Sequence, residues 1–271
     1  MGMKDSIRQL TPPVLISLAK RLRGDGKKSA CGLSGDYRSW DEAMAASTGY
    51  GSTVILDKTR EALLKVKKGE AVYERDSVLF DEIQYAWPLL AGLMWAAARS
   101  GGRLDVLDFG GSLGSTYFQN RAFLERLPAV RWNVIEQPAH VREGRRSFED
   151  ASLKFYESIA ECLARTAPNV VLLSGVLQYL ERPYALLADV LALPCDCVII
   201  DRTPFYSGDS DRLSVQRIDP AIFDASYPMW TFSLGRFRKA LGGRAVLEEF
   251  DSFENGMFGL MWKGFILGGP E

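Results

Sequence analysis

Residues 106–115, VLDFGGSLGS, have the types and spacing that point most clearly to chemistry. An apolar run ends in a carboxylate, and a turn almost without side chains follows at once, in the order Asp108, Gly110, Gly111, Ser112 and Gly114. Glycines let a ligand approach the backbone, and the first turn of the next helix offers unpaired N–H groups. A carboxylate here is unfavourable beside a pyrophosphate, and the match to the dinucleotide-binding pattern G-x-G-x-x-G is imperfect. The segment therefore predicts a site for a ligand that carries positive charge and no phosphate.

The elements that must position this turn begin near residue 103. Short β-branched runs alternate there with helix-length segments, in LDVLDFG, RWNVIEQ, SLKFYESI, NVVLLSG and CDCVIIDR. This alternation predicts βαβ units and a parallel sheet covered on both faces. Two late runs, RAVLEEFDSF and GLMWKGFILG, flank a Glu-Asn-Gly turn and predict a closing antiparallel hairpin. We expect an α/β, Rossmann-like domain over residues 101–271, with ligands bound at the carboxyl ends of its strands.

Residues 40–100 have few strand signals, and we expect residues 1–100 to form a helical N-terminal cap or subdomain. Ser39 and Glu42 form a capping box, a second helix runs through Lys67, and a third is expected over residues 78–100 with a bend at Pro88. Residues 3–24 have the pattern of a basic amphipathic helix. Such a helix either packs its apolar face on its own protein or makes weak contact with an anionic membrane, and both alternatives stay open.

Composition excludes several other classes of function. The chain of 271 residues has 33 basic and 34 acidic residues and a net charge of -1, which gives no reason to expect a nucleic-acid partner. No apolar run is long enough to span a bilayer and no signal peptide is evident, so we expect a cytoplasmic protein. His140 is the only histidine, and Cys195 and Cys197 lie too close together for a structural zinc site. We expect no metal.

The turn after the first predicted strand resembles the first motif of class I S-adenosylmethionine-dependent methyltransferases, [DE]-x-G-x-G-x-G, with Ser112 in place of the middle glycine. S-adenosylmethionine has a cationic amino-acid part and no phosphate. The resemblance implies a seven-stranded, mostly parallel class I methyltransferase sheet. It also implies cofactor contacts at Asp108, Gly110, Gly111, Ser112, Gly114, Ser115, Gln137, Ser158, Ile159, Ser174 and Gly175. Glu136, 22 residues after Gly114 (136 − 114), is able to accept hydrogen bonds from both ribose hydroxyls; the alternative is a solvated loop glutamate.

The segment VLQYL is expected to face the methyl acceptor. Where a related group of O-methyltransferases has a catalytic histidine, this chain has Gln178, which orients a substrate but removes no proton at neutral pH. Tyr179 and Asp201 are candidate bases by strand-end position only, so the base is unassigned. His140 is expected to have a structural or surface role. Residues 73–77, YERDS, predict either a lid or a capped helix start, and residues 201–230 predict a long loop that either grips a sugar or covers the core.

Over its whole length the chain resembles a bacterial methyltransferase family linked with surface-polysaccharide gene clusters. The matching elements are GYGS, GEAVYERDSVLFDEIQY, VLDFGGSLGSTYFQN, VLQYL and DRTPF. This resemblance implies O-methylation of a small molecule or glycan precursor by in-line transfer from S-adenosylmethionine. A second hypothesis is a catalytically inactive module that binds the cofactor or a partner. A third, an NAD-dependent oxidoreductase, is disfavoured by Asp108 and by the terminal hairpin.

Overall fold

The computed structural model describes residues 32–48, 53–219 and 225–270. The amphipathic segment 3–24 and the GYGS element, residues 49–52, lie outside the described residues, as does Cys31. Within the described ranges, no helix combines the length and the apolar character that crossing a bilayer requires.

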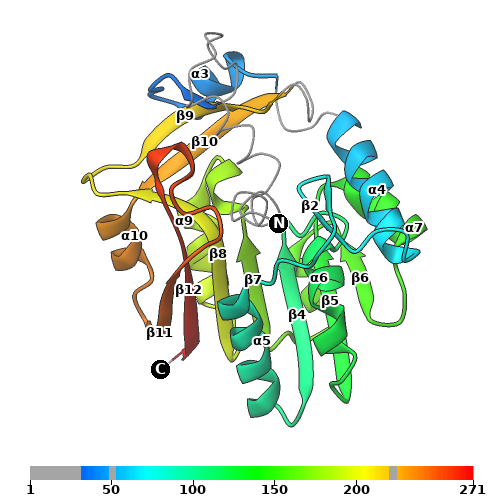
Figure 1. Ribbon diagram of the computed structural model, residues 1–271. Helices are drawn as coiled ribbons and strands as arrows, with labels where there is room; N and C mark the ends of the chain where they lie inside the picture. Colours follow the sequence, from blue (N-terminus) through cyan, green and yellow to red (C-terminus); the bar gives the residue numbers. More distant parts are fainter. Residues whose placement is uncertain (1–31, 49–52, 220–224, 271) are drawn as a thin grey trace, which may run out of the picture.

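Five parallel strands form the core of the main sheet, in the order β6-β5-β4-β7-β8 (Figure 1). They are β4 (Arg103–Phe109), β5 (Ala129–Ile135), β6 (Leu153–Tyr156), β7 (Val170–Ser174) and β8 (Cys197–Tyr206). Each coincides with one of the β-branched runs, so the predicted parallel sheet is confirmed. β4 is central, and its buried residues alternate between the two faces, which both carry helices.

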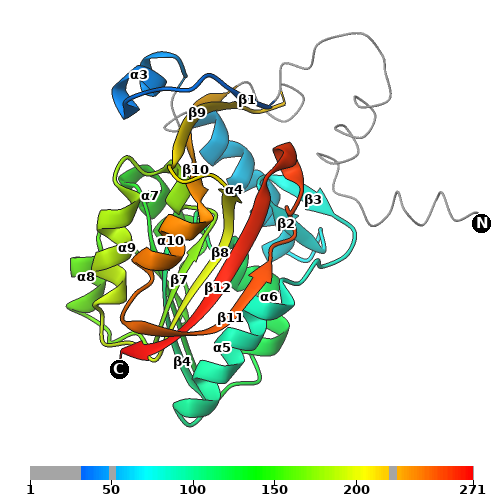
Figure 2. The same cartoon turned by 90° about the vertical axis from the view of Figure 1, so that its left-hand side faces the viewer.

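The sheet closes with the predicted antiparallel hairpin. β12 (Met261–Pro270) pairs antiparallel with β8 and with β11 (Arg244–Asp251) (Figure 2). Numbered along the chain, these seven strands lie in the order 3-2-1-4-5-7-6. Only the seventh strand, β12, runs antiparallel to the others. This mixed sheet is the Rossmann-like fold of class I methyltransferases.

Two groups of helices cover the two faces of the sheet. One face packs against α4 (Thr53–Lys67), α5 (Trp87–Arg99), α6 (Ser115–Leu124) and α7 (Pro138–Ser147). The other packs against α8 (Ile159–Leu163), α9 (Pro183–Leu191) and α10 (Leu234–Ala240). The division of the chain near residue 100 into a cap and a catalytic domain stays a prediction.

The prediction of a long loop over residues 201–230 is wrong. β8 runs on to Tyr206, where β10 (Ser226–Ser233) joins it in parallel, and β9 (Arg212–Arg217) and β1 (Gly32–Ser34) extend the sheet antiparallel (Figure 2). Leu213 and Val215 alternate inward and pack with Ala43 of α3 (Trp40–Ala45). The period of two along β9 is a strand signal, which the Gly, Ser and Asp residues before it obscured.

The helix predicted over residues 78–100 begins only at Trp87. Val78–Phe80 is strand β3, which pairs with β2 (Tyr73–Arg75) in a separate two-stranded sheet. Pro88 occupies the first turn of α5 instead of bending it, because proline lacks only an N–H that has no helical partner there. The segment YERDS is therefore a hairpin and not a capped helix start.

The turn between β4 and α6 places a non-glycine residue in a left-handed conformation. Ser112 has φ 55°, between Gly110 at 75° and Gly114 at 94°. A side chain in this region costs about 1–2 kcal/mol, more when it is β-branched. Serine thus occupies a position whose backbone favours the glycine of the motif.

Valine at this position should destabilise the fold. We expect the free energy of unfolding of Ser112→Val to lie about 1 kcal/mol or more below that of Ser112→Gly, because valine resists positive φ. Urea unfolding followed by circular dichroism measures the difference, with Ser112→Ala as the control for loss of the hydroxyl. Equal stability of the valine and glycine variants would contradict the strained turn.

Candidate active site

A cavity of about 440 Å³ lies at the carboxyl ends of β4, β7 and β8. The β2–β3 hairpin and the connection between β11 and β12 form further parts of its wall. The structure brings most of the residues predicted from the sequence into this lining, namely Asp108, Gly110, Gly111, Ser112, Ser115, Ser174, Gly175, Gln178, Tyr179 and Asp201. Those outside the lining are Gly114, Glu136, Gln137, Ser158 and Ile159. One cavity therefore joins the predicted cofactor turn to the predicted acceptor segment.

Asp108 is the last residue but one of β4, and its carboxyl group is buried beneath the glycine turn. Its Oδ2 accepts a hydrogen bond from Trp132 Nε1 of β5 at 2.9 Å. A Cβ at Gly111 would lie 2.3 Å from the same oxygen, so only glycine fits above it. Burial raises the pKa of Asp108 to about 7; the Trp132 hydrogen bond lowers it and the charge of Glu136 raises it. A cation entering the cavity would offset the cost of ionising this carboxyl.

The residues predicted to hold the nucleoside lie along the neighbouring strand ends. Glu136 follows β5, where its Oε2 accepts from the backbone N–H of Gln137 at 2.7 Å. The N–H of Gly110 donates to Ile135 O at 2.9 Å, which joins the glycine turn to this strand end. Ser158 is exposed and caps α8 by accepting from the Glu161 N–H at 3.1 Å. Glu136 thus follows the strand end to which the glycine turn is joined but lies outside the cavity lining, whereas Ser158 caps its own helix.

A second buried carboxyl connects the β2–β3 hairpin to the cofactor turn. Glu74 accepts from Ser115 Oγ at 2.7 Å and from the Ser77 N–H at 2.7 Å. Only 1% of the residue is exposed, and burial raises its pKa to about 7 although these two hydrogen bonds lower it. Glu74 therefore fixes the hairpin against the first turn of α6.

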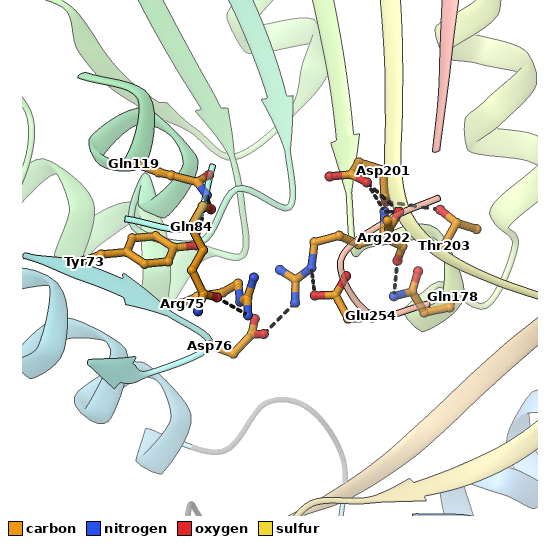
Figure 3. A network of polar contacts seen from close by, with 11 residues as sticks. Tyr73, Arg75, Asp76, Gln84, Gln119, Gln178, Asp201, Arg202, Thr203 and Glu254 are labelled. Carbon is orange, nitrogen blue, oxygen red and sulfur yellow. Dashed lines mark hydrogen bonds and ion pairs between the residues drawn. The ribbon is translucent and has the colours of Figure 1, made fainter. Parts of the chain in front are cut away.

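The Arg202 guanidinium crosses the cavity and joins its two sides (Figure 3). Its Nη2 lies 2.5 Å from Asp76 Oδ2 in the hairpin turn, and its Nε lies 2.9 Å from Glu254 Oε1 in the β11–β12 connection. Burial opposes the charge, but the carboxylates of Asp76 and Glu254 outweigh it and raise the pKa of Arg202 above its ordinary value. Positive φ angles occur at Asp76, Ser77 and Arg202. The ion pair between Arg202 and Asp76 thus joins two segments of strained backbone.

The candidate bases differ in their pKa and in the hydrogen bonds that they already make. Burial raises the pKa of Tyr179 well above its ordinary value, and its hydroxyl donates to Gln216 Oε1 at 2.9 Å, so it is a poor base near neutral pH. Asp201 Oδ1 accepts from the Arg202 N–H at 2.8 Å and from Ser252 Oγ at 2.7 Å. Burial raises the pKa of Asp201 to about 6. Gln178 Nε2 donates to Arg202 O at 3.2 Å.

His140 is buried on α7 and belongs to the cavity lining, so a surface role is wrong. Among the residues that the structure describes, no group of three or more His, Cys, Asp or Glu side chains is arranged to hold a metal ion.

Sequence reasoning missed Glu74, Trp132 and Glu254. Glu74 lies in the sequence element GEAVYERDSVLFDEIQY and Arg202 lies in DRTPF, but neither element predicts a role for these residues. Glu254 was part of the turn signal between two strands, and no local pattern distinguishes it from an ordinary turn residue.

The Asp76–Arg202 pair should limit opening of the hairpin. Asp76→Asn keeps a residue that tolerates positive φ but removes the charge, so we expect amide hydrogen exchange over residues 73–80 to quicken about threefold or more. Exposed Asp81, in the same segment, supplies the control variant Asp81→Asn. Unchanged exchange in Asp76→Asn would show that the ion pair does not hold the hairpin.

Comparison with known proteins yields similar solved structures. No family model matches the chain, and no curated protein matches it. The N-terminal domain of EvdMO1, in the presence of SAH and D-fucose, is 15% identical, with coverage of 81% of this chain and 100% of that one and a TM-score of 0.48. ChlM, the magnesium protoporphyrin IX methyltransferase of Synechocystis PCC 6803, with bound SAM, is 14% identical, with coverage of 68% and 78% and a TM-score of 0.43.

A third similar structure is the 1,6-didemethyltoxoflavin-N1-methyltransferase of Burkholderia thailandensis. It is 16% identical, with coverage of 89% of this chain and 94% of that one and a TM-score of 0.42. The likeness in all three cases is one of fold, and the fold assignment rests on the strand order described above.

Proposed function

We propose that this protein is an S-adenosylmethionine-dependent methyltransferase that methylates a hydroxyl group of a small molecule or glycan. The observation that carries the proposal is the buried Asp108 carboxyl beneath the glycine turn at the end of β4. Among the described residues its one hydrogen-bond partner is Trp132, a neutral donor, and no cation there lowers its pKa. A cationic ligand placed over this turn meets that need.

The turn also fits a cofactor that lies against the backbone. A Cβ at Gly110 would lie 2.4 Å from Val176 Cγ2, and one at Gly111 would meet Asp108. The side chains of Val176 and Asp108 thus occupy the space that a Cβ atom at either glycine would need. The peptide groups of the two glycines therefore form this part of the cavity wall. Asp108 would attract the ammonium group of the methionine part, Glu136 would accept from the ribose hydroxyls, and Ser174 and Gly175 would lie along the methionine backbone.

When bound, S-adenosylmethionine supplies an electrophilic methyl carbon on a sulfonium. The chain's own contribution is to hold an acceptor in line and to exclude water. Such positioning reaches effective molarities of about 10⁵ M or more, so a missing histidine does not prevent transfer. The hairpin held by Arg202 lines the cavity next to the strand ends. A role in surface-polysaccharide synthesis rests on the sequence motifs alone and is part of the proposal.

One observation favours a second candidate, a module that binds the cofactor without turnover. Neither Gln178 nor Tyr179 is suited to take a proton, since the first is an amide and burial raises the pKa of the second. The two candidates share the cofactor site and differ in whether a methyl group is transferred.

Isothermal titration with S-adenosylhomocysteine tests the shared cofactor site. We expect binding by the wild type and a loss of about tenfold or more in Asp108→Asn and in Glu136→Gln, because each removes a hydrogen-bonding charge. Glu125→Gln, at an exposed position beyond α6, is the control. Folded wild-type protein that takes up no S-adenosylhomocysteine, or that is stabilised by NAD instead, would exclude the proposal.

The raised pKa of Asp108 also predicts a pH-dependent stability difference. Its pKa rises from 3.8 to about 7 on folding, so between these values the folded chain binds a proton that the unfolded chain has released. The wild type should therefore lose stability more steeply than Asp108→Asn as the pH rises through this window, by at most about 1.4 kcal/mol per pH unit. Urea unfolding of both proteins from pH 4 to 8 measures the difference. A difference that stays constant over this range would contradict the shifted pKa.

A further inference from the structure

Two buried oxygens in the wall of the cavity lack a hydrogen-bond donor. Among the described residues, Gln178 Oε1 and Glu254 Oε2 make no hydrogen bond, although the residues are only 1% and 9% exposed. Both residues line the cavity, and each is tied to Arg202 through its other polar atom (Figure 3). A buried acceptor without a donor costs about 1–3 kcal/mol, so the pair is suited to a ligand that brings donors.

The charges around the cavity restrict what that ligand is. Its described lining contains two guanidinium groups and seven carboxyl groups, those of Glu74, Asp76, Asp108, Asp201, Asp219, Asp251 and Glu254. Arg202 already pairs with Asp76 and Glu254. The other guanidinium, that of Arg75, donates to Gln84 Oε1 and stacks over Phe80 and Phe253. Carboxyl groups thus outnumber guanidinium groups in the described lining, which disfavours a phosphate or carboxylate and favours an uncharged donor.

We propose that Glu254 and Gln178 bind the hydroxyl groups of an uncharged polyol or glycoside as the methyl acceptor, and that Glu254 Oε2 takes the proton of the hydroxyl that is methylated. This rests on the proposed methyltransferase function. The O–H bond breaks as the oxygen–methyl bond forms, and the proton passes to the carboxylate. The carbon–sulfur bond breaks with its electron pair left on sulfur.

Glu254 is suited to this role by its geometry and its chemistry. Arg202 Nε holds Oε1 at 2.9 Å, which fixes the carboxylate and leaves Oε2 for the acceptor. Asp201 also uses one oxygen, Oδ1, for Ser252 and the Arg202 N–H, but unlike Glu254 Oε2 its other oxygen is not a buried acceptor without a donor. A hydroxyl oxygen becomes strongly acidic as it bonds to the methyl carbon, so a carboxylate is basic enough to accept its proton.

The experiment uses two sugars that differ in charge. Saturation-transfer NMR on the full chain measures binding of methyl α-D-glucopyranoside and of α-D-glucose 1-phosphate, each with and without S-adenosylhomocysteine. We expect the uncharged glycoside to bind the wild type and the phosphate to bind more weakly. Absence of glycoside binding, or a preference for the phosphate, would overturn the proposal.

Matched variants then test the two residues. Glu254→Gln keeps the size of the side chain and Gln178→Met removes the amide, and we expect each to weaken glycoside binding about tenfold. Glu249→Gln is the control, since this β11 carboxylate lies outside the cavity lining and pairs with Arg238 and Lys263. Glycoside binding equal to that of the wild type in both Glu254→Gln and Gln178→Met would refute the subsite.

Turnover and cofactor binding separate this inference from the proposed function. With labelled S-adenosylmethionine, any methyl transfer to the glycoside by the wild type should fall about 100-fold in Glu254→Gln, as expected for loss of a general base. Wild-type turnover in that variant would refute the proton transfer. A parallel titration with S-adenosylhomocysteine should be unchanged in Glu254→Gln, which also reports its folding. If the wild type binds the glycoside but no S-adenosylhomocysteine, the proposed function fails and the polyol site does not.

Discussion

The arrangement of the cavity rests on the guanidinium of Arg202. It pairs with Asp76, 126 residues away in sequence, and with Glu254, 52 residues away, and so joins the β2–β3 hairpin, β8 and the β11–β12 connection. Left-handed backbone at Asp76, Ser77 and Arg202 costs about 1–2 kcal/mol at each residue. Because local preferences oppose these conformations, the contacts around Arg202 must maintain them, as is common at functional sites.

Buried carboxyls give the same region its electrostatic character. The pKa values of Asp108 and Glu74 are both raised to about 7 by burial, on the two sides of the turn that follows β4. Their ionisation opposes folding near neutral pH and favours the entry of positive charge. The apolar cores on both faces of the parallel sheet supply the stability that compensates for the cost of burying these carboxyl groups.

Errors in the sequence predictions fall where tertiary pairing overrides a local signal. Val78–Phe80 lies in an apolar stretch before Pro88 that is compatible with a helix, yet pairing with Tyr73–Arg75 makes it a strand. β9 and β10 follow a segment rich in turn residues, and their pairing with each other and with the end of β8 makes them part of the sheet. Short apolar runs do not distinguish strand from buried helix, so only their partners decide the outcome.

By itself the sequence determined the parallel sheet, its terminal hairpin and the glycine turn with Asp108, because their periodicity and turn residues are local signals. It also located most of the cavity lining, since the ends of parallel strands meet at one edge of a sheet. Only the tertiary structure decided that Trp132 donates to Asp108 and that Arg202 joins Asp76 to Glu254. It also decided that Glu254 Oε2 finds no donor among the described residues. These contacts form between side chains from distant segments of the chain. Their burial and pairing cannot be predicted from the spacing of residues along the sequence.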